Sequence, residues 1–217
     1  MTLIQGQPGA VLCDFDGTAT PCEVIGLIYS RFASGNCDQL VQQWLRGEIS
    51  TPEELRGCFA TIKASREEME AELASTPLDP GFPTLVEFCR QRGYPFAILS
   101  DGLRWYIDYI LQQHGFQDFT VYANEITFKP EGYTLTFPWY SSDTPRRGTS
   151  KPMIIQRYQA EGYKVVFIGD GLSDIEAVKA ADVVYARADL LEYCRLNGIP
   201  GTGFSDLSDL LKRWKSV

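Results

Sequence analysis

Two aspartates near the start of the chain lie where a buried strand is expected to end. The apolar run 10–13 leads into Asp14, and Asp16 and Gly17 follow. Successive side chains of a strand point to opposite faces, so the two carboxylates share one side only if the strand ends between them and the chain bends, which a glycine permits. Carboxylates in such a place can act as a nucleophile, as a proton donor or as metal ligands. A turn with two solvated aspartates is the alternative interpretation.

Two further segments carry groups that could hold an anion. Ser100-Asp101-Gly102 follows the apolar run 96–99, and a hydroxyl before a glycine-bearing turn can offer one O–H and several N–H donors. Lys151 opens a helix, where the helix dipole favours anions and a lysine is electrostatically misplaced. An ordinary turn and an exposed surface lysine are the alternatives for these two segments.

A second pair of carboxylates, Asp170 and Asp174, follows the apolar run 165–168 and is flanked by glycines. Solubility alone is a poor explanation for two carboxylates at a strand end, although Asp174 could instead cap a helix over 174–181. All these candidate groups therefore lie at or near the carboxyl ends of predicted parallel strands, which is where open α/β sheets bind ligands.

The elements that must position these residues alternate between strands and helices. An appended β-hairpin is predicted from 125–128 and 133–137, around a Pro-Glu-Gly turn. The pattern indicates an α/β fold with a Rossmann-like parallel sheet core and helices on both faces. Strands are predicted over 10–13, 96–99, 120–123, 165–168 and 183–186.

The segment of residues 21–80 has a helical pattern and lacks a convincing strand. About 60 residues of this kind are long for one crossover, which favours a separate helical cap, although the helices could simply cover one face of the sheet. We predict a catalytic core of residues 1–20 and 81–217 and a cap of residues 21–80. The expected cap helices are two between residues 23 and 44, one to about residue 64 that Thr51 caps with Glu54 completing a capping box, and one over 66–74.

Composition narrows the range of functions. The 217-residue chain has a formal net charge of −8 and one histidine, which argues against a nucleic acid partner and against chemistry that needs paired histidines. No run of about 18 apolar residues is present to span a membrane, and the N-terminal segment makes a poor signal peptide. Six cysteines without a Cys-x-x-Cys pair fit free thiols in a reducing cytoplasm better than a disulfide framework or a zinc site. The oligomeric state does not follow from the sequence.

The order of the motifs resembles a known enzyme superfamily. Asp14-Phe15-Asp16-Gly17-Thr18, then Ser100, then Lys151, then Gly169-Asp170 with Asp174 is similar to the motif set of the haloacid dehalogenase-like hydrolases. The helical insert after the first motif resembles the cap of the phosphoserine phosphatase-like branch. The tail, with Gly169-Asp170-Gly171-Leu172-Ser173-Asp174 and Ala186-Arg187-Ala188, is most similar to methionine-salvage phosphatases, which act on 2-hydroxy-3-keto-5-methylthiopentenyl-1-phosphate. Many members of the branch carry Ser-Gly-Gly and an Asn where this chain has Asp101 and Ser173.

The resemblance implies a magnesium-dependent phosphatase that works through an aspartyl phosphate. Asp14 would be the nucleophile, and the Asp16 side chain would protonate the leaving alcohol and then deprotonate the attacking water. Mg²⁺ would be held by Asp14, the backbone carbonyl of Asp16, Asp170 and, directly or through water, Asp174. Ser100, the amide of Asp101 and Lys151 would bind phosphate oxygens.

The rest of a small phosphorylated metabolite would be recognised by the cap. Glu23 and Arg56 are its polar candidates, with a solvated helix face as the alternative for both. Three other activities stay open. A phosphotransferase or phosphomutase could share every motif. A phospho-accepting signalling module would not need Asp16 or the insert. A dehalogenase would not need the second pair of carboxylates, Asp170 and Asp174.

Overall fold

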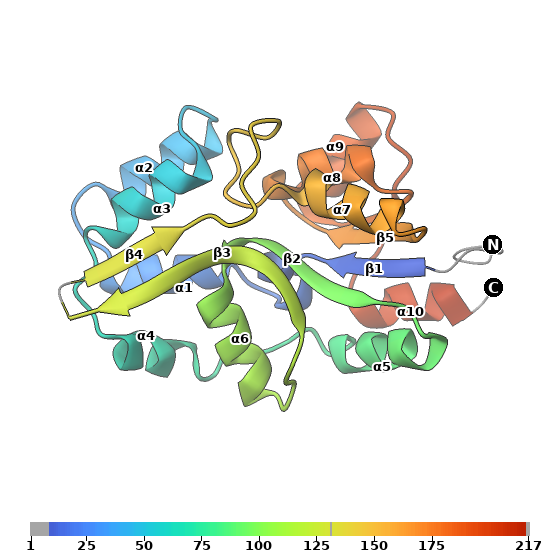
Figure 1. Ribbon diagram of the computed structural model, residues 1–217, viewed down its shortest axis with the longest axis horizontal. Helices are drawn as coiled ribbons and strands as arrows, with labels where there is room; N and C mark the ends of the chain where they lie inside the picture. The colour runs from blue at the N-terminus through green and yellow to red at the C-terminus, as the bar shows by residue number, and fades with distance from the viewer. Residues whose placement is uncertain (1–8, 131, 216–217) are drawn as a thin grey trace. The chain divides into compact units, whose positions relative to one another are not determined.

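A computed structural model describes residues 9–130 and 132–215 of the chain (Figure 1). The strands in this part of the chain form a mostly parallel seven-stranded sheet in the order β4-β3-β2-β1-β5-β6-β7. The chain divides into two compact units. The first contains the described residues up to Cys22, 77–99 and those from Lys151 onward, and the second contains 23–76 and 100–150.

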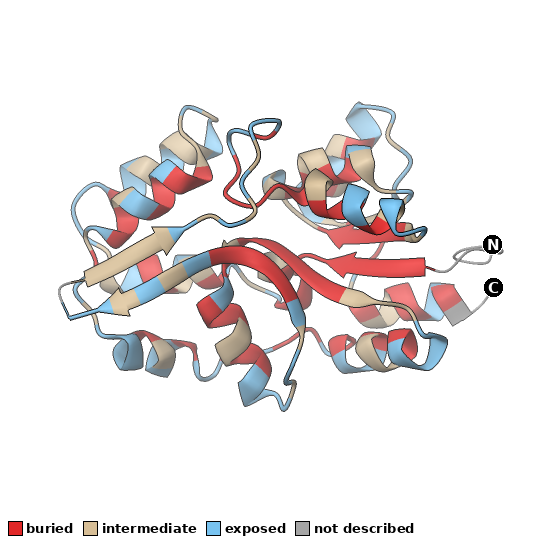
Figure 2. Ribbon diagram, viewed as in Figure 1, coloured by how far each residue is buried: buried red, intermediate tan, exposed pale blue. Residues whose placement is uncertain are grey.

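The first unit is built around strand β1 (Gly9–Cys13), which pairs in parallel with β2 (Phe96–Leu103) and β5 (Lys164–Gly169). Every residue of β1 is buried (Figure 2), as a parallel strand covered on both faces requires. Strands β6 (Val183–Ala186) and β7 (Thr202–Gly203) continue the sheet beyond β5. The helices that cover its faces are α5 (Phe82–Arg92), α7 (Lys151–Ala160), α8 (Ile175–Ala180), α9 (Ala188–Leu196) and α10 (Leu207–Lys215).

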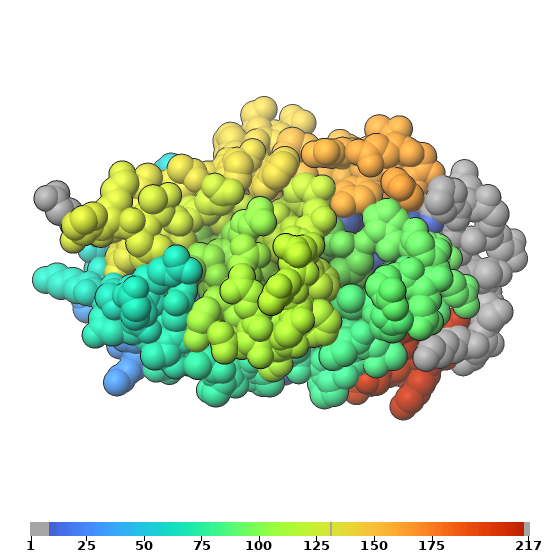
Figure 3. All heavy atoms as spheres, turned by 60° about the horizontal axis from the view of Figure 1, so that its bottom comes forward, coloured from blue at the N-terminus to red at the C-terminus, as the bar shows by residue number. Residues whose placement is uncertain are grey.

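The second unit combines the helical insert with a β-hairpin and one more helix. Strand β3 (Thr120–Lys129) pairs antiparallel with β4 (Gly132–Thr136), and the Tyr133 ring packs edge-on against Phe59 of the insert, with 5.6 Å between ring centroids. Helices α4 (Arg66–Leu73) and α6 (Arg104–Gln113) contact each other through a 2.8 Å hydrogen bond from Trp105 Nε1 to Glu70. The atoms of these two segments form neighbouring groups on the face shown in Figure 3. The helices are α1 (Val24–Phe32), α2 (Cys37–Leu45), α3 (Thr51–Phe59), α4 (Arg66–Leu73) and α6 (Arg104–Gln113).

Three boundaries differ from those expected from the sequence. Helix α3 is capped by Ser50 and Glu53, one residue earlier than the predicted pair of Thr51 and Glu54, so the capping prediction is wrong by one position. Thr51 is already the first helical residue, which leaves its hydroxyl available for another contact.

Strand β2 does not end at residue 99 but continues through Leu103. The predicted strands 120–123 and 125–128 form one continuous strand, β3.

The expectation that all cysteines are free thiols is wrong for one pair. Cys37, at the start of α2, and Cys58, near the end of α3, form a disulfide in the second unit. Sequence spacing did not indicate this pair, because the residues are brought together by the antiparallel packing of two helices rather than by a short motif. The other four cysteines are free thiols. None of the helices in the described ranges combines the length and the apolar character that a membrane crossing requires.

Candidate active site

The turn after β1 has the bend that the Asp-x-Asp-Gly pattern predicts. Asp14 follows the last residue of the strand in an extended conformation, and Gly17 adopts the left-handed region with φ of +70°. A side chain at position 17 would collide with the Asp170 carboxylate. Glycine at this position therefore provides both the backbone conformation and the space for a second acidic group.

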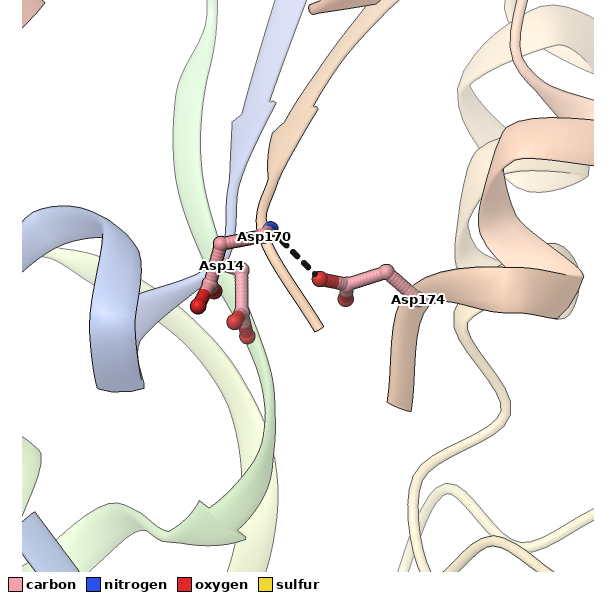
Figure 4. Close-up of side chains that lie close together, drawn as sticks. All are labelled: Asp14, Asp170 and Asp174. Carbon is pink, nitrogen blue, oxygen red and sulfur yellow. Dashed lines mark hydrogen bonds between the residues drawn. The ribbon is translucent and has the colours of Figure 1, made fainter. Parts of the chain in front are cut away.

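Three carboxylates of the first unit converge at the ends of β1 and β5 (Figure 4). Asp14, Asp170 and Asp174 each contribute an oxygen, and these oxygens all lie within 4.8 Å of one another. Asp174 Oδ2 accepts hydrogen bonds from the backbone N–H groups of Asp170 at 3.0 Å and Gly171 at 3.2 Å. The Asp174 side chain makes no capping hydrogen bond to α8, so the alternative that it serves only as a helix cap is wrong.

Lys151 lies inside this cluster. Its side chain is 1% exposed, and Nζ donates to Asp14 Oδ1 at 2.7 Å and to Asp174 Oδ1 at 2.5 Å. Burial works to lower the pKa of Lys151, but the Asp14 and Asp174 carboxylates outweigh it and raise the pKa above its ordinary value. The interpretation of Lys151 as a surface residue is therefore wrong, and its place at the start of α7 is explained by these two carboxylates.

The cluster holds more negative than positive charge. Burial, together with Asp174 and Asp170, raises the pKa of Asp14 well above its ordinary range, and Lys151 opposes the shift. Burial and Asp174 likewise raise the pKa of Asp170 to about 6. Buried carboxylates that repel one another are stabilised by a bound cation, and an all-oxygen donor set suits a hard divalent ion such as Mg²⁺. The residues present thus fit a magnesium ion, with Asp14, Asp170 and Asp174 as its side-chain ligands.

Other residues of the first unit support the cluster, and sequence reasoning assigned them no role. Thr18 Oγ1 donates to Asp170 Oδ1 at 2.8 Å. Arg187 Nε donates to the Gly17 carbonyl oxygen at 2.9 Å, and its Nη1 lies 3.7 Å from Asp79. Thr18 and Arg187 stand in quoted motifs, so their positions were visible in the sequence. Their contacts were not, because each joins segments that lie more than 100 positions apart in the chain.

Asp16 is half-buried in the turn, and its side chain is not a member of the carboxylate cluster. The metal contact predicted for this residue runs through its backbone carbonyl and stays a prediction, as does its role in proton transfer.

The remaining predicted site residues belong to the second unit. Ser100 is buried in β2, and its hydroxyl accepts a hydrogen bond from the Gly102 N–H at 3.0 Å. The Asp101 side chain is buried and accepts hydrogen bonds from the backbone N–H groups of the segment 148–149. Glu23 is exposed at the start of α1, and Arg56 is exposed on α3 with its guanidinium 4.8 Å from the centroid of the Phe137 ring.

Comparison with known proteins identifies the family to which this fold and site belong. Residues 11–179 match the family model of the haloacid dehalogenase-like hydrolases. The chain belongs to that family. A 2-hydroxy-3-keto-5-methylthiopentenyl-1-phosphate phosphatase of an Exiguobacterium species is 30% identical over 95% of this chain and 97% of its own length. A phosphatase of the same name from Brevibacillus brevis is 29% identical over 95% of each chain.

Solved structures agree on the fold. A structure of a phospho-aspartyl intermediate analogue of phosphoserine phosphatase superposes on this chain with a TM-score of 0.72. The two proteins are 20% identical, and the match covers 95% of this chain and 99% of the other. The family match and the named relatives make the chain a phosphatase of the haloacid dehalogenase-like type. The predictions of fold class, family and enzyme class are thereby confirmed.

Proposed function

We propose that this haloacid dehalogenase-like phosphatase is a magnesium-dependent phosphomonoester hydrolase in which Asp14 is the nucleophile. The observation that supports this most directly is the buried Lys151, which contacts Asp14 and Asp174 at once. A lysine in this position orients the Asp14 carboxylate and supplies positive charge where a phosphate dianion would approach.

The reaction takes place in two displacements. The Asp14 carboxylate attacks phosphorus, the bond between phosphorus and the ester oxygen breaks, and the Asp16 carboxyl gives its proton to the departing alcohol. Water then attacks the aspartyl phosphate while Asp16 takes a proton from it, which releases inorganic phosphate and restores both carboxyl groups. Ser100, the Asp101 amide and Lys151 hold the phosphate oxygens in both steps.

Asp14, Asp170 and Asp174 would hold Mg²⁺, with the Asp16 carbonyl as a further ligand. When bound, the ion neutralises part of the charge repulsion between the nucleophile and the phosphate.

For the substrate we propose a small phosphorylated metabolite, with 2-hydroxy-3-keto-5-methylthiopentenyl-1-phosphate as the first candidate because the relatives that align over almost the whole chain carry that name. Residues 21–80 act as a cap that recognises the part of the substrate beyond phosphate, with Glu23 and Arg56 as polar candidates. Phosphoserine is the second candidate, because the similar folds include phosphoserine phosphatases.

A panel of phosphorylated metabolites tests this assignment. The methylthiopentenyl phosphate, phosphoserine and an aryl phosphate are incubated with the enzyme in Mg²⁺ and in EDTA, and released phosphate is measured. We expect turnover that requires Mg²⁺, with the highest kcat/KM for the first compound. Product analysis with an added acceptor alcohol separates a hydrolase from a phosphotransferase. Turnover in EDTA equal to that in Mg²⁺ contradicts the metal assignment.

Asp16→Asn tests the proton-transfer role. Because this variant has no acidic proton to donate to the leaving alcohol, its hydrolysis of esters with poor leaving groups should slow more than its hydrolysis of activated aryl esters. Equal losses across a series of leaving groups would contradict the role.

A further inference from the structure

The Asp101 carboxylate is the centre of a buried hydrogen-bond network within the second unit. It accepts from the backbone N–H groups of Gly148 and Thr149, both at 2.8 Å through Oδ1, and from the Thr51 hydroxyl at 2.6 Å through Oδ2. The residue is 8% exposed. Both oxygens of one side chain are therefore fixed by donors from two segments that are far apart in the sequence.

Asn124 of β3 holds the backbone of the same residue. Its Nδ2 donates to the Asp101 carbonyl oxygen at 2.6 Å, and its Oδ1 accepts from the Thr149 hydroxyl at 3.2 Å. A side chain at Gly148 would collide with the Asn124 amide, so the segment 148–149 approaches β3 closely. Side chain and main chain of Asp101 are thus constrained together.

Thr51 brings the helical insert into this network. As the first residue of α3 it donates its own N–H to the Arg146 carbonyl at 2.8 Å, and its hydroxyl accepts from Trp44 Nε1 of α2 at 3.0 Å. The Thr51 hydroxyl therefore accepts a hydrogen bond from Trp44 and donates one to Asp101. These two hydrogen bonds join α2 and α3 to the chain segment directly after Ser100.

We propose that Asp101 is a positioning residue that couples the start of α3 to the Ser100–Gly102 segment and to the segment 146–149 that leads along the chain into Lys151. This inference rests on the proposed function, in which Ser100, the Asp101 amide and Lys151 hold phosphate. An amide whose own side chain is held at both oxygens has a fixed direction. Small displacements of such groups lower the rate of a positioned reaction by up to about a hundredfold.

The experiment changes the contact between Thr51 and Asp101. Thr51→Val keeps the size of the side chain and removes the hydroxyl, whereas Thr51→Ser keeps the hydroxyl. Thr61→Val is the matched control, because Thr61 also uses its hydroxyl in two hydrogen bonds within the same unit, to the Cys58 carbonyl and from the Ser34 N–H, away from Asp101. We expect kcat/KM to fall about tenfold in Thr51→Val and to change less than about twofold in Thr51→Ser and Thr61→Val.

Asp101→Asn provides the second arm, since it keeps an oxygen for the two backbone N–H groups. We expect its loss in kcat/KM and that of Thr51→Val to be non-additive in the double variant, because both act through one contact. Losses that multiply, or a Thr51→Val variant that is less stable than wild type but equally active, overturn the proposal.

Amide hydrogen exchange separates this inference from the proposed function. Thr51→Val should accelerate exchange over 100–102 and 148–149 even if the wild-type protein hydrolyses none of the phosphates. Unchanged exchange in both segments refutes the coupling. If exchange is faster in Thr51→Val but the wild type hydrolyses none of the phosphates, the proposed substrate and mechanism fail and the coupling stands.

Discussion

Asp14 in the first unit and Asp101 in the second are both buried aspartates, but their partners differ. Asp101 accepts hydrogen bonds from the Thr51 hydroxyl and from the backbone N–H groups of Gly148 and Thr149. Asp14 shares the single ammonium of Lys151 with Asp174 and lies in one cluster with Asp170. The first arrangement holds one carboxylate with donors from two distant segments, whereas the second brings several carboxylates together with excess negative charge.

This difference indicates what each site is for. The hydrogen bonds from Thr51 and from the segment 148–149 fix the conformation of the Asp101 side chain. Mutual repulsion around Asp14 destabilises the folded protein and is relieved when a cation enters, which is typical of a site maintained for chemistry. The two sites should therefore respond differently to mutation, pH and metal.

The largest expected effect is on turnover at Asp14. Asp14→Asn removes the attacking carboxylate, so we expect kcat to fall at least about a thousandfold while the far-UV circular dichroism spectrum is unchanged. Steady-state phosphate release from the aryl ester measures the loss. Near wild-type turnover in this variant would remove the distinction between a reactive Asp14 and a structural Asp101.

The next effect concerns how the second unit is held together. The disulfide between Cys37 and Cys58 closes a loop with a sequence separation of 21, which corresponds to a stabilisation of about 3 kcal/mol in the chain-entropy model. Reduction should lower the free energy of unfolding in urea by about that amount. In the double variant Cys37→Ala, Cys58→Ala the reductant should have no effect. A wild-type protein that is equally stable with and without reductant would contradict the prediction.

Glu54 provides a pH-dependent test within the second unit. Burial raises its pKa from 4.5 to about 7, Tyr29 opposes the shift, and Asp101 adds to it. Because the folded pKa lies above the ordinary value, the folded state holds the proton more tightly. Stability should therefore fall as pH rises from about 4.5 to about 7 and then level off.

Glu54→Gln should remove this part of the pH dependence, which is about 2.5 kcal/mol between pH 5 and pH 8. Urea unfolding at pH 5 and pH 8 gives the difference for each protein. The wild type should lose more stability between these two values than the variant does. Equal losses would show that Glu54 is not protonated in the folded protein at pH 5 to any greater extent than in the unfolded chain.

The parts of the fold that follow from local pattern were predictable from the sequence. The apolar runs that became β1 and β5 stand out because these parallel strands are buried on both faces. Asp14, Asp170 and Asp174 could be proposed because each follows such a strand, and the resemblance to the haloacid dehalogenase-like hydrolases added Lys151 to them.

Contacts between distant segments could not be predicted in this way. The side chain of Asp101 could have pointed outward or toward a substrate, and only the packing of Thr51 and the segment 148–149 against it decides its direction. The pairing of Cys37 with Cys58 likewise depends on how α2 lies against α3. β7 was missed because two residues carry no periodic pattern.

The smallest expected effect is a change in stability, and its direction should differ between the Asp14 cluster and Asp101. Asp170→Asn removes one negative charge from the cluster and keeps an oxygen for the Thr18 hydroxyl. In EDTA at pH 8 the variant should be more stable than the wild type by about 1 kcal/mol, because repulsion with the neighbouring carboxylates is relieved.

In saturating Mg²⁺ the order should reverse. A ligand present at about a hundred times its Kd stabilises the wild type by about 2.7 kcal/mol, and the variant has lost a metal ligand. Asp101→Asn is the control, and it should lower stability in both buffers because its hydrogen bonds to Thr51 and to the segment 148–149 do not depend on a metal. Thermal unfolding of the three proteins in each buffer measures these differences. If Asp170→Asn is destabilised equally in EDTA and in Mg²⁺, the Asp14 cluster is a structural network like that of Asp101, and the magnesium assignment fails with it.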